Sequence, residues 1–476
     1  MEKNRKDNRT NNMHIQLAQL PSVEEVLQQE ELRLLSGRYS RRMITPLVRE
    51  VLAEERKRIR AGALPPTIFD IIKSCTTLIE QEYQSLIKPV INGTGVVLHT
   101  NLGRAALGQT LFDDALPALT GFNNLEYNLW DGQRGKRGEF VEKMLSVFSG
   151  AENALILNNN AAAVFLILKV LAKDKEVIIS RGELVQIGGG FRIPDILRES
   201  GAILREVGTT NQTTITDYHD AITENTGLIL KVHQSNFALE GFTRSVDIKE
   251  LKILGKKYKL PVVADLGSGA FLQTEQFALA HEPMVQEMVR SDADLVCFST
   301  DKLLGGPQGG IICGKSEYIN RIRKDPLYRT FRVGKLTLCL LQSTILYYLQ
   351  ERAIEDLPLW RMISVPAEDI KKRCMRLARS LKKRGIPAYI SEGVSLIGGG
   401  SLPGKTLPTY LLGLKIEKDV AELDKRLRLS DPAVLGRVKD GHLFFDPRTI
   451  EPHYDKKLVE LIQSAFYQKY NEEEVR

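Results

Sequence analysis

The feature that most constrains the fold of this chain is a regular alternation of short apolar segments and helical patterns after about residue 150. The apolar segments have the length of buried strands, and patterns such as Ile248–Tyr258 fill the gaps with helical periodicity. Such alternation favours a mostly parallel sheet covered by helices on both faces, an α/β fold. The predicted strands are Ala154–Leu157, Val177–Ile179, Leu228–Val232, Val262–Ala264 and Leu295–Phe298.

The residues before this alternation have a helical pattern. Apolar spacing predicts a helix over residues 15–36 with Ser22 as its N-cap, and a second helix that starts after Thr45, with Pro46 in its first turn, and runs to Arg60. The segment 61–66 reads as a boundary, and a third helix is predicted over residues 68–86. We therefore expect a helical N-terminal domain at residues 1–60 and a helical linker at 61–88.

After about residue 345 the pattern becomes α+β. A long helical stretch is predicted over residues 361–381, a strand at Thr409–Leu414, a hairpin turn at Asp440–Gly441 and a helix over Tyr454–Tyr467. We expect a large domain at residues 89–344 and a smaller C-terminal domain at 345–476.

Composition excludes several classes of protein. Of the 476 residues, 43% are hydrophobic and 26% are charged, as in ordinary soluble globular chains. The longest apolar run, Ala161–Leu168, is far shorter than the roughly 20 residues of a membrane-spanning helix. The five cysteines include no CxxC pair and the seven histidines no HxxxH pair, so no disulfide framework and no metal site are predicted. With no apolar block near the N-terminus, a cytoplasmic location is expected.

Positive charge is concentrated near the N-terminus. The net charge is +7, and residues 1–60 carry 13 Lys and Arg against 9 Asp and Glu. Many of these cations fall in two clusters, Arg38-Arg41-Arg42 and Arg56-Lys57-Arg58-Arg60. A basic helical module that contacts phosphates would have this composition, and so would a solvated helix surface.

The sharpest local pattern is Ser299-Thr300-Asp301-Lys302 followed by a glycine-rich turn that ends at Gly310. A lysine just beyond a strand of an α/β sheet lies where ligands bind. Its amine can form a Schiff base with pyridoxal phosphate, and the glycine-rich turn would let backbone approach the ring or its phosphate. A surface lysine in a tight turn is the alternative.

Other residues support a pyridoxal-phosphate site. Asp265 ends an apolar strand, where its carboxylate could pair with the protonated pyridine nitrogen. Asn159, Asn160 and Ala161 follow another strand and open a helix, whose free N–H groups suit a phosphate. Ser299 could add a hydroxyl. The order of these groups along the chain favours the cofactor site.

A longer motif in the sequence points to a protein family. The segment Ile91-Asn92-Gly93-Thr94-Gly95-Val96-Val97-Leu98-His99-Thr100-Asn101-Leu102-Gly103-Arg104 closely resembles one in the bacterial selenocysteine synthase (L-seryl-tRNA(Sec) selenium transferase) family. The segments 158–163, 181–185 and 207–211, the Asp265 strand end and the Asp301-Lys302 turn resemble the same family. The resemblance covers nearly the whole chain.

The resemblance implies an aspartate-aminotransferase-like pyridoxal-phosphate fold (fold type I) in a ring-shaped homodecamer. It implies conversion of seryl-tRNA(Sec) to selenocysteinyl-tRNA(Sec) with selenophosphate, through loss of water and addition of selenium to an aminoacrylyl-tRNA intermediate. The N-terminal domain would grip the tRNA. The implied roles are Schiff-base lysine for Lys302, pyridinium partner for Asp265, catalytic neighbour for Asp301, and binding of the donor's anionic group for Arg104, Arg329 and Arg332.

Two other functions fit parts of the pattern. A related pyridoxal-phosphate lyase or transferase could act on a small amino acid without tRNA, although a small substrate needs no basic helical module. A tRNA-binding protein with an inactive pyridoxal site is the other, although Asp265 and Lys302 are both present.

Overall fold

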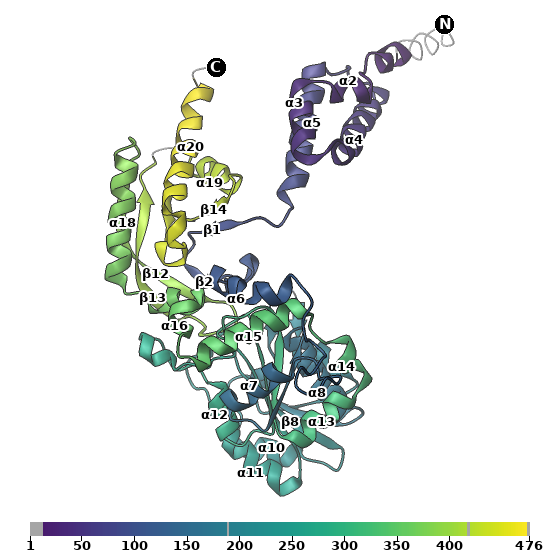
Figure 1. Ribbon diagram of the computed structural model, residues 1–476, viewed down its shortest axis with the longest axis vertical. Helices are drawn as coiled ribbons and strands as arrows, with labels where there is room; N and C mark the ends of the chain where they lie inside the picture. Colours follow the sequence, from purple (N-terminus) through teal and green to yellow (C-terminus); the bar gives the residue numbers. More distant parts are fainter. Residues whose placement is uncertain (1–12, 188–189, 417–418, 474–476) are drawn as a thin grey trace. The chain divides into compact units, whose positions relative to one another are not determined.

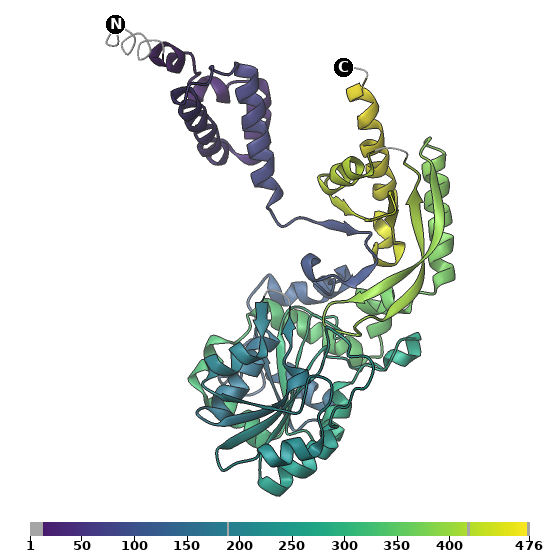
Figure 2. The same ribbon diagram turned by 180° about the vertical axis from the view of Figure 1, so that it is seen from behind.

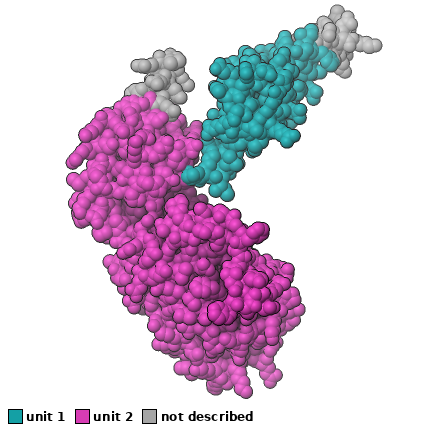
Figure 3. All heavy atoms as spheres, in the orientation of Figure 1, with its two compact units in different colours: residues 1–89 teal, residues 90–476 magenta. Residues whose placement is uncertain are grey.

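Residues 13–187, 190–416 and 419–473 are described by the computed structural model, which divides into two compact units at residues 1–89 and 90–476 (Figure 3). The N-terminal tail, Met1–Asn12, lies outside the described residues. Among the residues that are described, no helix is long and apolar enough to cross a membrane.

The N-terminal unit is a helical bundle with its own core (Figure 1). Its labelled helices are α2 (Val23–Leu27), α3 (Glu30–Tyr39), α4 (Arg41–Arg60) and α5 (Ile68–Gln84). Apolar side chains from all four meet in one cluster, and the rings of Tyr39 and Tyr83 stack with centroids 3.6 Å apart. Burial of these apolar faces, rather than helix propensity, is what stabilises such short helices.

Three predictions for this unit need correction. The single helix predicted over 15–36 is interrupted, because Ser22 caps a new helix through a capping box with Glu25. Helix α4 begins at Arg41, so Pro46 lies inside it rather than in its first turn. The predicted linker is not a linker, since α5 buries Ile71, Cys75 and Ile79 in the core of this unit.

The second unit contains a seven-stranded sheet in the order β3-β11-β10-β9-β8-β4-β7. All neighbouring pairs are parallel except those of β11, which is antiparallel to both β10 and β3, so the predicted mostly parallel sheet is confirmed. The bounds are β3 Asn153–Leu157, β4 Glu176–Ser180, β7 Ile203–Val207, β8 Thr226–Val232, β9 Val262–Gly267, β10 Leu295–Ser299 and β11 Gly310–Gly314.

Helices cover both faces of this sheet, as Figures 1 and 2 show from opposite sides. Alternate strand residues point to opposite faces, which gives two separate apolar clusters. One face packs against α8 (Asn160–Ala172), α9 (Ile193–Ser200) and α13 (Ser316–Lys324). The other packs against a second set: α6 (Gln109–Leu119), α7 (Glu139–Ser149), α10 (Ile215–Ala221), α11 (Ile248–Tyr258), α12 (Val285–Arg290) and α15 (Lys335–Leu349).

Strand β7 was not predicted from the sequence. It lies at the edge of the sheet and carries Arg205 and Glu206 among exposed positions. An edge strand has one unpaired side and tolerates charge, so it lacks the continuous apolar run that marks the central strands.

The C-terminal part forms a second sheet, ordered β15-β16-β13-β12-β2. The predicted Asp440–Gly441 turn joins β15 to β16, with positive φ at both residues, and is confirmed. The helix predicted over 361–381 is two helices, because Pro366 holds Val365 extended between them. Strand β2 pairs with β12, so residues 96–98 belong to this sheet rather than to the large domain. The bounds are β2 Val96–Leu98, β12 Ala388–Gly398, β13 Thr406–Leu414, β15 Arg437–Lys439, β16 His442–Phe445, α17 Pro358–Ser364, α18 Ala367–Lys382, α19 Val420–Arg428 and α20 Asp455–Glu473.

Candidate active site

Most of the predicted site residues gather at the carboxyl ends of the central strands. A cavity of about 250 Å³ lies there, where an α/β sheet places its ligands. Its lining comes from the ends of β3, β8, β9 and β10 and from the loop before α6. The lining residues are Arg104, Asn159, Asn160, Ala161, Val232, His233, Ser235, Asp265, Gly267, Ser299, Lys302 and Gln308.

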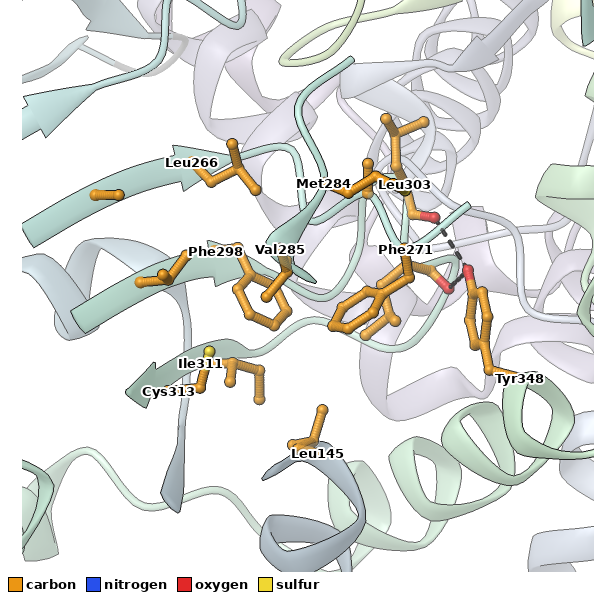
Figure 4. Packing of buried hydrophobic residues seen from close by; sticks show 14 of the residues in the cluster. Leu145, Leu266, Phe271, Met284, Val285, Phe298, Leu303, Ile311, Cys313 and Tyr348 are labelled. Atoms are coloured by element: carbon orange, nitrogen blue, oxygen red, sulfur yellow. Dashed lines mark hydrogen bonds between the residues drawn. The ribbon is translucent and has the colours of Figure 1, made fainter. Parts of the chain in front are cut away.

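Lys302 is 5% exposed and lies in a turn that is held by hydrogen bonds. The Leu303 N–H donates to the Ser268 carbonyl at 2.9 Å, and Gly305 N–H donates to the Lys302 carbonyl at 2.9 Å. The Tyr348 hydroxyl of α15 contacts the carbonyls of Leu303 and Leu304, at 3.2 and 2.9 Å (Figure 4). These hydrogen bonds fix the backbone that carries the lysine.

Burial lowers the pKa of the Lys302 amine below its ordinary value, and nearby charges modify this effect. The carboxylates of Asp265, Asp301 and Glu282 act to raise the pKa, whereas the Arg104 guanidinium acts to lower it. A lysine with a lowered pKa has more of the neutral amine that attacks a carbonyl or removes a proton.

Asp265 is buried in β9 and held by two donors. The Asn160 Nδ2 atom donates to Asp265 Oδ1 at 2.8 Å, and the Cys297 thiol contacts the same oxygen at 3.7 Å. Burial raises the pKa of Asp265, and the Asn160 hydrogen bond opposes that rise. Because both donors contact Oδ1, Oδ2 is the oxygen open to a cationic partner such as a pyridinium N–H.

The turn at 158–161 opens α8. Asn159 is the N-cap, and its side chain accepts the Ala162 N–H at 2.8 Å. The Asn160 side chain points to Asp265, so it supports that carboxylate instead of reaching a phosphate directly. A Cβ on Gly310 would lie 2.1 Å from the Asn159 carbonyl oxygen, so only glycine permits this strand to pass so close.

Arg104 and Asp301 form an ion pair, with Nη1 to Oδ2 at 2.8 Å. Arg104 has a left-handed backbone, with φ of 64°, immediately after Gly103. The Ala105 N–H donates to the Asp301 carbonyl at 3.1 Å, which ties the predicted Ile91–Arg104 motif to the lysine turn. The other carboxylate oxygen of Asp301 is buried and has no hydrogen-bond partner among the residues that the structure describes.

Arg329 and Arg332 do not line the cavity that contains Lys302. Arg329 is exposed on α14 (Pro326–Thr330), and Arg332 follows the helix with its Nε atom buried and unpartnered. The carbonyl of Phe331, between them, accepts the Asn158 N–H at 2.9 Å. This segment therefore packs against the turn that opens α8, next to the cavity.

Sequence reasoning missed three residues around Lys302. His233 follows β8, whose last residue pairs with Asp265 of β9, and it lines the cavity, but a lone histidine carries little signal in sequence. Glu282 lies 3.2 Å from His233 and Gly400 packs on Lys302. Glu282 belongs to no local motif, and the glycine run at 398–400 indicated only a loop.

The residues of the cavity fit pyridoxal phosphate. Lys302 could bind its aldehyde carbon, Asp265 its ring nitrogen, and the N-terminus of the 13-residue helix α8 its phosphate. The buried unpartnered oxygens of Asn160 and Asp301 fit a polar ligand as well. Fold and site together define the class as fold type I pyridoxal-phosphate enzymes, as the sequence predicted.

Comparison with known proteins gives the family. Residues 90–451 match the family model "L-seryl-tRNA selenium transferase", and residues 17–56 match "Selenocysteine synthase N terminal". The chain therefore belongs to the L-seryl-tRNA selenium transferase family, which confirms the predicted resemblance.

Individual relatives agree with the family models. The chain is 45% identical over 452 residues to the L-seryl-tRNA(Sec) selenium transferase of Carboxydothermus hydrogenoformans, covering 93% of this chain and 97% of that one. It is 42% identical over 450 residues to the protein of the same name in Aquifex aeolicus, with coverage of 93% and 97%. Among solved structures, D-glucosaminate-6-phosphate ammonia-lyase has a TM-score of 0.56 at 18% identity, covering 81% of this chain and 97% of that one, which supports the fold.

Proposed function

We propose that this chain converts L-seryl-tRNA(Sec) to L-selenocysteinyl-tRNA(Sec), with pyridoxal phosphate as its cofactor and selenophosphate as the selenium donor. The observation that carries the proposal is the cavity where buried Lys302, buried Asp265 and the Arg104–Asp301 pair come together. Relatives named for this reaction match more than nine-tenths of the chain.

Bound pyridoxal phosphate supplies an electron sink that makes the α-proton of the seryl group removable. The lowered pKa of Lys302 suits its amine to take that proton. The Asp265 carboxylate would hold a proton on the ring nitrogen of the bound cofactor. Asp301 is the proposed catalytic neighbour, because it adjoins Lys302 in the chain and holds Arg104 at the edge of the cavity.

The selenium donor is anionic, and arginine suits it because a guanidinium matches two phosphate oxygens at once. Arg104 lines the cavity, and Arg329 and Arg332 flank the Phe331 contact beside it. Arg329→Ala and Arg332→Ala should raise the selenophosphate concentration needed for half-maximal rate and leave seryl-tRNA binding unchanged. Arg321→Ala, at an exposed position of α13, is the control. Equal donor dependence in all variants would remove Arg329 and Arg332 from the donor site.

The N-terminal unit is proposed to bind the tRNA. Four exposed arginines on α4 are spaced by seven, seven and four residues, which places them on one face of the helix. This α4 arginine row (Arg42, Arg49, Arg56 and Arg60) lies to one side of the buried face and extends over about 27 Å. A row of this length can meet several phosphates of an RNA backbone.

Arg49→Gln/Arg56→Gln should weaken seryl-tRNA(Sec) binding and make its salt dependence shallower by roughly one unit of log–log slope per lost phosphate contact. The matched control is Arg205→Gln/Arg290→Gln, which removes the same charge from exposed positions of the second unit. Equal affinity and slope in both double variants would contradict the assignment of the row.

The central experiment is reconstitution with pyridoxal phosphate, seryl-tRNA(Sec) and selenophosphate, followed by detection of selenocysteinyl-tRNA. Bulk seryl-tRNA(Ser) and free serine are the comparison substrates. Turnover of free serine at the same rate would favour a lyase or transferase for a small amino acid. Binding of tRNA without any turnover would favour a tRNA-binding protein.

We further propose that the chain self-associates in the cytoplasm, as the homodecamer that the family resemblance implies. Large apolar side chains are exposed between α6 and α7, including Phe122, Leu129 and Trp130. Exposed apolar surface of this kind is typical of subunit contacts. Light scattering on the full chain tests this, and a monomer at micromolar concentration would refute it.

A further inference from the structure

Glu282 is a buried carboxylate with no role in the site as proposed so far. It is 2% exposed and lies between the 3-10 turn η4 (Thr274–Phe277) and α12. Its N–H donates to Thr274 Oγ1 at 3.0 Å, and the Thr274 hydroxyl donates to the Ala280 carbonyl at 2.7 Å. These bonds fix the backbone from which the carboxylate projects.

The two oxygens of Glu282 contact two different parts of the fold. Oε1 lies 3.2 Å from Nε2 of His233, which lines the cavity with Lys302. Oε2 accepts the Leu402 N–H at 3.1 Å, in the loop between β12 and β13. One carboxylate therefore joins the end of a large-sheet strand to the tip of the small-sheet hairpin.

The hairpin tip, residues 398–405, packs directly on the lysine. A Cβ on Gly400 would lie 2.6 Å from Cε and 2.8 Å from Nζ of Lys302. Leu402 has φ of 45°, a left-handed conformation that is unfavourable for a bulky residue and persists only where neighbours hold it. The contact with Glu282 is such a restraint.

We propose that Glu282 is a positioning residue for Lys302, acting through two contacts: it holds the hairpin tip against the amine and orients His233 in the cavity wall. The inference rests on the proposed function only in that Lys302 is taken as the residue that captures pyridoxal phosphate.

Glu282 also contributes charge. Burial acts to raise its pKa, but the contacts with His233, Ser268 and the Leu402 N–H together outweigh burial and leave the pKa below its ordinary value. The charged groups that act on the Lys302 amine are Asp265 of β9, Arg104 before α6, Asp301 after β10 and Glu282. Removing the Glu282 charge should make the amine easier to deprotonate.

Two conservative variants separate the effect of the length of the Glu282 side chain from the effect of its charge. Glu282→Asp keeps the charge but is one methylene too short to contact both partners. Glu282→Gln keeps the length and removes the charge. Glu275→Gln, an exposed carboxylate of the same segment, is the control. Two measurements are made on the full chain: tryptic cleavage at Lys405 of the hairpin tip relative to exposed Lys173, and the pH profile of pyridoxal-phosphate uptake followed by its visible band.

Glu282→Asp should be cleaved at Lys405 about fivefold faster, as expected for loss of one buried hydrogen bond, with no change at Lys173. Glu282→Gln should take up the cofactor at lower pH than the wild type and keep the tip protected. Cleavage that rises equally at both lysines would mean a merely structural role and overturn the proposal. Variants that match the wild type in both measurements would overturn it too, whereas a wild type that takes up no pyridoxal phosphate would refute the proposed cofactor instead.

Discussion

Arg104 donates a hydrogen bond of 2.8 Å to Asp301, the residue that precedes Lys302. The pair joins residues 197 positions apart and brings the sequence motif at 91–104 to the lysine turn. It places a guanidinium at the edge of the cavity while compensating the charge of a carboxylate that is almost fully buried.

Asp301→Asn should remove the ionic character of this pair and reduce turnover by about tenfold or more, since hydrogen bonds between charged groups contribute roughly 1.5–3 kcal/mol. The visible band of bound pyridoxal phosphate should remain. Steady-state rates with matched cofactor loading measure the effect. Asp424→Asn, which breaks an exposed pair with Arg428, should be neutral. Full activity of Asp301→Asn would exclude a catalytic role.

Lys302→Ala should abolish the visible band that survives dialysis, because the amine that captures the aldehyde is gone. Lys405→Ala, at an exposed lysine of the hairpin tip, should keep it. Absorbance after borohydride treatment and dialysis shows whether each variant retains the cofactor. A stable band in Lys302→Ala would mean that another lysine holds the cofactor.

Asn160→Ala should change the pH dependence of the reaction. Burial already raises the pKa of Asp265, and the Asn160 hydrogen bond opposes that rise, so its loss raises the pKa further. Asp265 then becomes protonated, and stops supporting a pyridinium, at a higher pH than in the wild type. The acidic limb of the pH–rate profile should therefore move to higher pH. An unchanged limb would show that Asn160 does not support Asp265.

Gly310→Ala should lower the free energy of unfolding by about 1–3 kcal/mol and weaken pyridoxal-phosphate binding. The new methyl group would collide with the Asn159 carbonyl and displace the turn that opens α8. Gly334→Ala is the matched control, since its Cβ would meet nothing within 4 Å. Chemical denaturation and cofactor titration report both effects, and equal behaviour of the two variants would contradict the geometry.

Deletion of residues 1–89 should leave a chain that folds and takes up pyridoxal phosphate but binds seryl-tRNA(Sec) weakly. Deletion of residues 1–60 should behave worse, because α5 would remain with Ile71, Cys75 and Ile79 exposed to water. The two deletion variants are compared by their solubility, by the visible band of bound pyridoxal phosphate and by titration with tRNA. Full tRNA affinity in the shorter chain would exclude the N-terminal unit as the tRNA-binding part.

The sequence by itself determined the elements whose signals are local. The central strands are continuous apolar runs, the Ser22 cap is a short motif, and Asp440–Gly441 is a turn that needs positive φ. The order of Asp265 and Lys302 after two of those strands indicated the site, because carboxyl ends of neighbouring parallel strands meet at one edge of a sheet. Family resemblance supplied the proposed reaction.

Only the tertiary structure decided which way side chains point and what distant segments meet. Asn160 supports Asp265 rather than a phosphate because its amide lies 2.8 Å from a strand 105 residues away. Glu282 joins partners 49 and 120 residues distant, and no local pattern marks such a contact. Helix α5 looked like a linker because its apolar face finds its partners on α3 and α4 only once the bundle forms. Local propensity selects elements, whereas burial between elements that are far apart in sequence selects the site geometry.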